Sequence, residues 1–124
     1  MKRLIPACIL AILLTVICIV AYAVTRSSCD DTERMLDFCE SAFTSGEVDA
    51  ARTAADDFGN HWRRTKRVLA VFTGHYLLDN VSYSAARMSG FAQSGQDGAA
   101  LAECAQIREY LIQLLEEQGI ESAY

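Results

Sequence analysis

Residues 4–24 read LIPACILAILLTVICIVAYAV, an apolar run that decides the architecture of the chain, with Lys2 and Arg3 directly before it. A helix rises about 1.5 Å per residue, so this run spans ~31 Å and matches the roughly 30 Å hydrocarbon layer of a bilayer. We therefore predict a single transmembrane signal anchor over residues 4–24, with membrane lipid as its partner. Residues 1–3 are then a short cytoplasmic N-terminus.

Charge predicts the orientation of this single-pass anchor. Lys2 and Arg3 favour an inside N-terminus, because basic residues tend to stay on the cytoplasmic side; Arg26 opposes this weakly. Residues 25–124 would then lie outside the cell membrane. They contain all 16 acidic residues and nine of the 11 basic ones, a net charge of -7. Such an acidic domain is repelled by phosphates, so we expect no nucleic acid partner.

A cleaved secretory signal is the alternative interpretation of the same run. Ala21-Tyr22-Ala23 fits the small-x-small cleavage pattern, and cleavage near Ala23 would release a secreted helical protein. The length of the run favours the anchor, because the apolar region of a signal peptide is typically ~7 to 15 residues.

The rest of the chain carries apolar residues at steps of three and four, the spacing of amphipathic helices. Glycine-containing breaks near Gly46, Gly74 and Gly95 divide it into four segments. The predicted helices cover about residues 27–44, 47–72, 76–93 and 98–117. Strand-like alternation is lacking, and short connections make neighbouring helices antiparallel. We predict an all-α fold, in which one transmembrane helix is followed by a small antiparallel four-helix bundle over residues 25–124.

Three local features refine this prediction. Ser45 and Asp97 are candidate N-caps of the second and fourth helices of the bundle. Gly59 lies inside the second helix and favours a bend or break near residues 58–60, since glycine costs about 1 kcal/mol in a helix. Only Thr25 to Ser28 separate the apolar run from the first apolar stripe, so we expect the span to continue as the first helix of the bundle.

The chain resembles an uncharacterised family of short, single-pass bacterial membrane proteins, mainly from Firmicutes, known only as a domain of unknown function. The basic residues and apolar span at the amino end and a leucine-rich last helix are part of the resemblance. Its distinctive residues are Gly46-Glu47-Val48, Ala51, Phe58, Trp62, Phe72-Thr73-Gly74-His75 and Leu78-Asp79. This chain has fewer lysines and glutamates, and more alanines and cysteines, than the family pattern. The resemblance implies the topology and the fold and no activity.

His75 and Asp79 form the sharpest polar pair, because residues four apart share a helix face. With His61 they make a weak candidate cluster for a metal-dependent or hydrolytic site. The alternative, which we favour, is that His75 begins or caps the third helix and that Asp79 satisfies it or a backbone amide. The sequence lacks a His-Glu-x-x-His pattern. We therefore assign no catalytic, cofactor or metal residue.

Cysteine spacing allows at most one disulfide outside the span. Cys29 and Cys39 are about 15 Å apart along one helix, beyond the ~7 Å limit for bridging. Cys39 and Cys104 lie on the inward stripes of the first and fourth helices and form a candidate disulfide. The alternative is that all three are buried free thiols.

The remaining features predict structure and partners rather than chemistry. The basic residues between Arg63 and Arg67 are expected on a solvated helix face, with Trp62 in the core. Phosphate-binding loops and nucleophile elbows are lacking. We therefore expect a membrane-anchored extracytoplasmic module for protein–protein interaction or envelope structure, with another membrane or envelope protein as its partner and no enzymatic activity.

Overall fold

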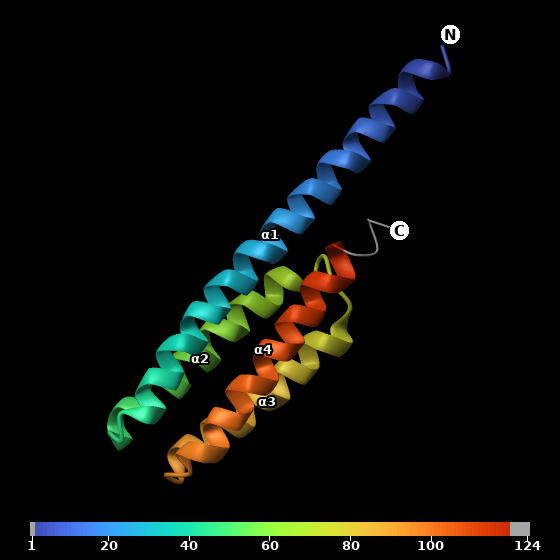
Figure 1. The fold of residues 1–124 in the computed structure, drawn as a ribbon. Helices are drawn as coiled ribbons and strands as arrows, with labels where there is room; N and C mark the ends of the chain where they lie inside the picture. Colours follow the sequence, from blue (N-terminus) through green and yellow to red (C-terminus); the bar gives the residue numbers. More distant parts are fainter. Residues whose placement is uncertain (1, 120–124) are drawn as a thin grey trace.

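The computed structural model describes residues 2–119 and contains four helices and no strand within that range. They are α1 (Leu4–Thr44), α2 (Val48–Leu69), α3 (His75–Gln93) and α4 (Asp97–Gly119). Figure 1 shows the amino-terminal half of α1 extending alone beyond a bundle made by the rest of the chain. The predicted all-α fold, with a long apolar helix leading into a bundle, is confirmed. Met1, in the predicted N-terminus, and residues 120–124, at the end of the predicted bundle domain, lie outside the described residues.

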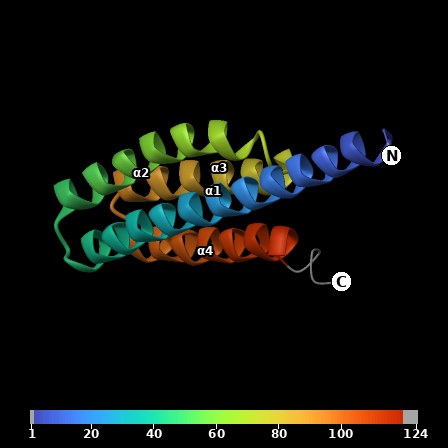
Figure 2. The ribbon, with the colours of Figure 1, turned by 90° about the horizontal axis from the view of Figure 1, so that it is seen from above.

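The bundle has an up-down-up-down order. Each helix packs against two neighbours, with α1 between α2 and α4, and α3 opposite α1. The view in Figure 2 shows the four helices running side by side along nearly one direction. Two turns, at residues 45–47 and 94–96, close the end of the bundle that is far from the lone helix. The connection between α2 and α3 and the end of α4 lie at the near end (Figure 1).

A continuous stripe on each helix builds the core. The three-four spacing turns about one side chain per helical turn toward the same side, so four stripes meet along the bundle axis. Fully buried members of these stripes include Leu36 on α1, Phe58 on α2, Met88 on α3 and Leu111 on α4. The core therefore runs through all four helices.

Helix α1 is a single helix of 41 residues. The predicted first bundle helix, about 27–44, is its carboxyl-terminal part, and the segment from Thr25 to Ser28 is helical too. Thr25 and Cys29 already belong to the buried stripe. No change of secondary structure separates the apolar run from the bundle.

The ends of α2 differ from the predicted ones. It begins after Glu47, without a side-chain cap, and Ser45 instead accepts a hydrogen bond from the Glu47 amide at 3.3 Å. It ends at Leu69 rather than near residue 72, because the Phe72 amide bonds the Leu69 carbonyl in a tighter turn. The helix is continuous through Gly59, so α2 has no break there.

The two distal turns need glycine. Gly46 and Gly95 have φ of 79° and 76°, in the left-handed region that residues with a Cβ rarely adopt. These positions let the chain reverse direction within three residues, which supports the antiparallel arrangement.

Candidate functional site

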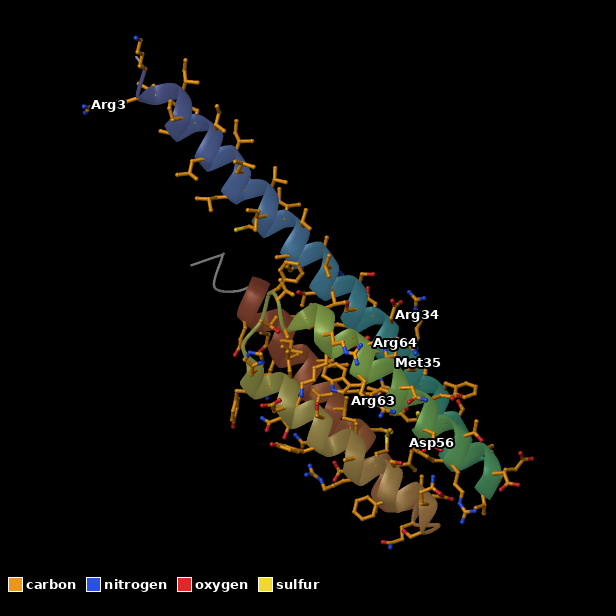
Figure 3. All side chains as sticks on the ribbon, turned by 180° about the vertical axis from the view of Figure 1, so that it is seen from behind. Arg3, Arg34, Met35, Asp56, Arg63 and Arg64 are labelled. Carbon is orange, nitrogen blue, oxygen red and sulfur yellow. The ribbon has the colours of Figure 1, made fainter. Side chains whose placement is uncertain are left out.

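The amino-terminal half of α1 carries a long, unpartnered apolar surface. All side chains of residues 4–20 are exposed, including Leu4 at 67% and Ile12 at 64%. Figure 3 shows these side chains projecting around the helix, away from the bundle. Within the described residues, α1 is the one helix long and apolar enough to cross a membrane. An aqueous protein rarely exposes so much contiguous apolar surface, so this half of α1 fits an apolar environment.

The bundle begins to cover α1 before the apolar run ends. Ala21 and Val24 are half-buried and Thr25 is fully buried. The last turn of residues 4–24 therefore lies against the near end of the bundle. The apolar run and the bundle overlap by about one helical turn.

His61 lies in a polar seam between α1 and α2. Its Nε2 is 3.1 Å from Thr32 Oγ1 and 3.3 Å from Thr65 Oγ1. The Thr32 hydroxyl donates its single proton to the Ser28 carbonyl at 2.8 Å. The hydrogen-bond network thus assigns Nε2–H of His61 as the donor to Thr32. His61 serves as a contact between two helices.

The seam gives the folded state a pH dependence. Burial lowers the pKa of His61 below its ordinary value of 6.5; Arg64 also lowers it, and Asp31 opposes the shift. The unfolded chain therefore takes up the proton at higher pH than the folded chain. The stabilising contribution is complete above about pH 6.5 and is lost as the pH falls through the lowered pKa.

Urea unfolding of the full chain in detergent at about pH 7.5 and pH 5.5 measures this effect. We expect the unfolding free energy to fall less between the two pH values in His61→Gln than in the wild type. His75→Gln is the matched control, because His75 is exposed, and it should behave like the wild type. Identical pH dependence in His61→Gln and the wild type would contradict the assigned role of His61.

The structure does not bring His61, His75 and Asp79 together. His75 is the exposed first residue of α3, following the extended cap residue Gly74. Asp79 turns toward α2 and accepts a bond from Lys66 Nζ at 2.9 Å. His61 faces the α1 side of α2 instead. Among residues 2–119, no three His, Cys, Asp or Glu side chains gather to hold a metal ion.

All three cysteines of the bundle are buried, with free thiols. Cys39 Sγ donates to the Ala54 carbonyl at 3.3 Å, and Cys104 Sγ lies 3.4 Å from Met88 Sδ. Burial raises the pKa of the Cys29, Cys39 and Cys104 thiols to about 12, which keeps them protonated and poorly nucleophilic. The Cys39–Cys104 disulfide stays a prediction.

A shallow groove of about 300 Å³ runs between α2 and α3. Small residues, among them Gly59 and Ala85, line it together with Trp62. Asp56 and Arg63 also line it, and Figure 3 labels both on α2. The lining also contains Ser82 and Ser89 but no histidine or cysteine, so the groove offers shape, two hydroxyl groups and a pair of opposite charges.

Trp62 joins α2 to α3. Its side chain is only 2% exposed, as predicted for a core residue, and its Nε1 donates to Ser82 Oγ at 2.9 Å. The Ser82 hydroxyl in turn donates a hydrogen bond to the Leu78 carbonyl at 3.1 Å. The indole is thus packed and hydrogen-bonded, the usual condition for a buried tryptophan.

The basic cluster of α2 faces solvent, as predicted. Arg63, Arg64 and Arg67 are exposed, and Arg63 bonds Asn60 on its own helix. Lys66 is half-buried and pairs with Asp79. The cluster is a solvated helix face with one interhelical ion pair.

Sequence patterns did not predict the ion pairs and side-chain hydrogen bonds between helices. Arg108 on α4 contacts α1 through Nε to Glu40 at 3.0 Å and Nη2 to Asp37 at 2.5 Å. The bond from Trp62 to Ser82 was missed as well. The only signal is that these polar residues flank the apolar stripes, and choosing their partners requires the helix order and register.

These features define the class: a long apolar helix that continues into an up-down four-helix bundle. A family model described as "Domain of unknown function (DUF4363)" matches residues 19–122. The chain belongs to this family, which confirms the resemblance to an uncharacterised family. Neither a curated protein nor a solved structure matches the chain.

Proposed function

We propose that the protein is a membrane-anchored module that holds its helical bundle outside the cytoplasm, where the bundle docks another membrane or envelope protein. One observation carries the proposal. Helix α1 is unbroken from Leu4 to Thr44, with an exposed apolar first half and a second half that is one of the four helices around the core. Such a helix places a folded domain directly on a membrane span.

The continuity of α1 supports a rigid helical junction between the span and the bundle rather than a flexible linker. A flexible linker would let a domain sample many orientations. Here residues 21–28 are helical and increasingly covered by the bundle. The tilt of the span therefore sets the orientation of the bundle relative to the membrane. Each face of the bundle is then held at a fixed height above the membrane surface.

The contacts within the bundle support a binding role over a reaction. His61 and Asp79, two members of the candidate cluster, are both engaged in contacts between helices. The groove between α2 and α3 is a concave surface with small residues and a charged pair at its lining. We propose this groove as the face that the partner protein contacts.

Topology is tested with a thiol reagent that does not cross membranes. In a Cys8→Ala/Cys18→Ala background, Ala105→Cys places a thiol on the exposed face of α4, and Lys2→Cys places one before the span. In right-side-out vesicles we expect labelling of Ala105→Cys without detergent and of Lys2→Cys only after detergent. The reverse pattern would overturn the proposed orientation.

Intact mass distinguishes the anchored protein from a secreted one. We expect the membrane fraction to contain the chain with residues 4–24 retained. A mature protein that begins near Val24 would contradict the anchor. Such a cut would remove the part of α1 that the bundle does not cover, since coverage begins at Ala21.

A further inference from the structure

Apolar side chains are exposed at the near end of the bundle. Val71, in the segment joining α2 to α3, is 75% exposed; Tyr76, in the first turn of α3, is 78% exposed, and Val68, in the last turn of α2, is 45% exposed. We call these three residues the proximal patch. They are exposed although the core ends immediately beside them, at Leu69 and Leu77.

Helix register puts the proximal patch level with the end of the apolar run. Thr32 contacts His61, and Cys39 contacts Ala54. Seven residues forward along α1 thus correspond to seven residues back along α2, so the two helices are antiparallel with a constant register. Extending the same register places position 71 beside position 22 of α1. The half-buried Ala21 and Val24 agree, because they mark how far the bundle reaches along α1. Figure 1 shows the α2–α3 connection beside the point where α1 leaves the bundle.

We propose that the proximal patch rests on the lipid bilayer and enters its interfacial layer, so that the bundle touches the membrane at a second place besides the span. This inference rests on the proposed function, because it requires residues 4–24 to fill the hydrocarbon. The span of ~31 Å leaves its last turn at the hydrocarbon boundary. Whatever lies level with that turn is at headgroup depth.

The chemistry of the patch suits that depth. Tyrosine is enriched at membrane interfaces, where the ring meets apolar chains and the hydroxyl meets water. Residues 68–78 contain no acidic residue, and the exposed Arg67 precedes Val68. The first acidic residue after the patch, Asp79, is paired with Lys66. The segment therefore lacks the negative charge that would repel an anionic lipid surface.

The segment is also held in place. The Val71 and Phe72 amides bond the Val68 and Leu69 carbonyls, and the Thr73 amide and hydroxyl both bond the Leu69 carbonyl. Val71 is thus presented by a hydrogen-bonded turn, and Val68 and Tyr76 by the flanking ends of α2 and α3, which limits the ordering cost of contact with lipid.

The test places an environment-sensitive fluorophore on Val71→Cys in the full chain, with Cys8 and Cys18 changed to Ala. The protein is reconstituted in phosphatidylcholine–phosphatidylglycerol vesicles with headgroup spin-labelled lipid as quencher. Val48→Cys is the matched control, an exposed valine at the far end of α2, ~32 Å along the helix from Leu69 at the end next to position 71. We expect blue-shifted, quenched emission from position 71 and no quenching from position 48.

A third label separates this inference from the proposed function. Leu13→Cys lies mid-span and should be quenched by lipid spin-labelled deep in the acyl chain. If Leu13→Cys is not quenched, residues 4–24 do not span the membrane, and both the proposed anchor and the proposed lipid contact of the patch are overturned. If Leu13→Cys is quenched while positions 71 and 48 behave alike, the patch does not touch the membrane. If Val71→Cys loses the helical circular dichroism signal of the folded protein, the same quenching measurement is made with the label on Tyr76→Cys.

Discussion

Replacing Phe58 by alanine is expected to lower the free energy of unfolding by about 3 to 5 kcal/mol. Phe58 is fully buried on α2, at the middle of the core stripe. Its removal loses the transfer free energy of the ring and leaves a cavity that the close-packed helices fill only in part. Urea unfolding of the full chain in detergent, followed by circular dichroism, measures the change.

Phe38→Ala is the matched control for this experiment. Phe38 lies on α1 with 59% of its side chain exposed, so its removal should change the free energy of unfolding by less than about 1 kcal/mol. Equal effects at the two positions would show that the core of the bundle is wrongly placed.

A buried charge on α4 is expected to have an effect at least as large. Leu111→Asp places a carboxyl group at a fully buried position, where no cation lies on the same stripe. Either the carboxyl group stays protonated with its pKa strongly raised, or the core admits water. We expect a loss of more than about 4 kcal/mol, seen as loss of the cooperative urea transition.

Ile112→Asp, at the next residue, is the control for Leu111→Asp. Ile112 is 43% exposed, and we expect its replacement to cost less than about 1 kcal/mol. The pair tests the rotation of α4 about its axis. If Ile112→Asp were the more damaging change, α4 would have to be turned relative to the structure.

The three-four spacing of apolar residues was sufficient to predict four helices and their buried faces. Trp62 in the core and Arg63 to Arg67 on a solvated face followed from the same rule. The spacing alone did not give the carboxyl end of α2, because Val71 and Phe72 are apolar and extend the pattern. A tighter turn at Leu69 ends the helix there, and it depends on local hydrogen bonds.

The polar contacts were harder to predict. His61 contacts Thr65 four residues on, as helix spacing allows, but its contact with Thr32 on α1 and that of Asp79 with Lys66 on α2 are between helices. Such pairings depend on which helices are neighbours and on their register. The proximal patch was hidden for the same reason, since Val71 and Tyr22 become level only when α2 packs antiparallel to α1.

The distance between two spin labels across the junction tests the central claim, that one continuous helix joins the span to the bundle. Labels at Leu13→Cys and Ser41→Cys, in the Cys8→Ala/Cys18→Ala chain in lipid nanodiscs, report it by pulsed electron resonance. The 28 helical steps between them predict one narrow distribution near ~42 Å. Ser27→Pro, which removes a junction hydrogen bond, should broaden it. A broad or clearly shorter distribution in the chain without this proline would contradict the account.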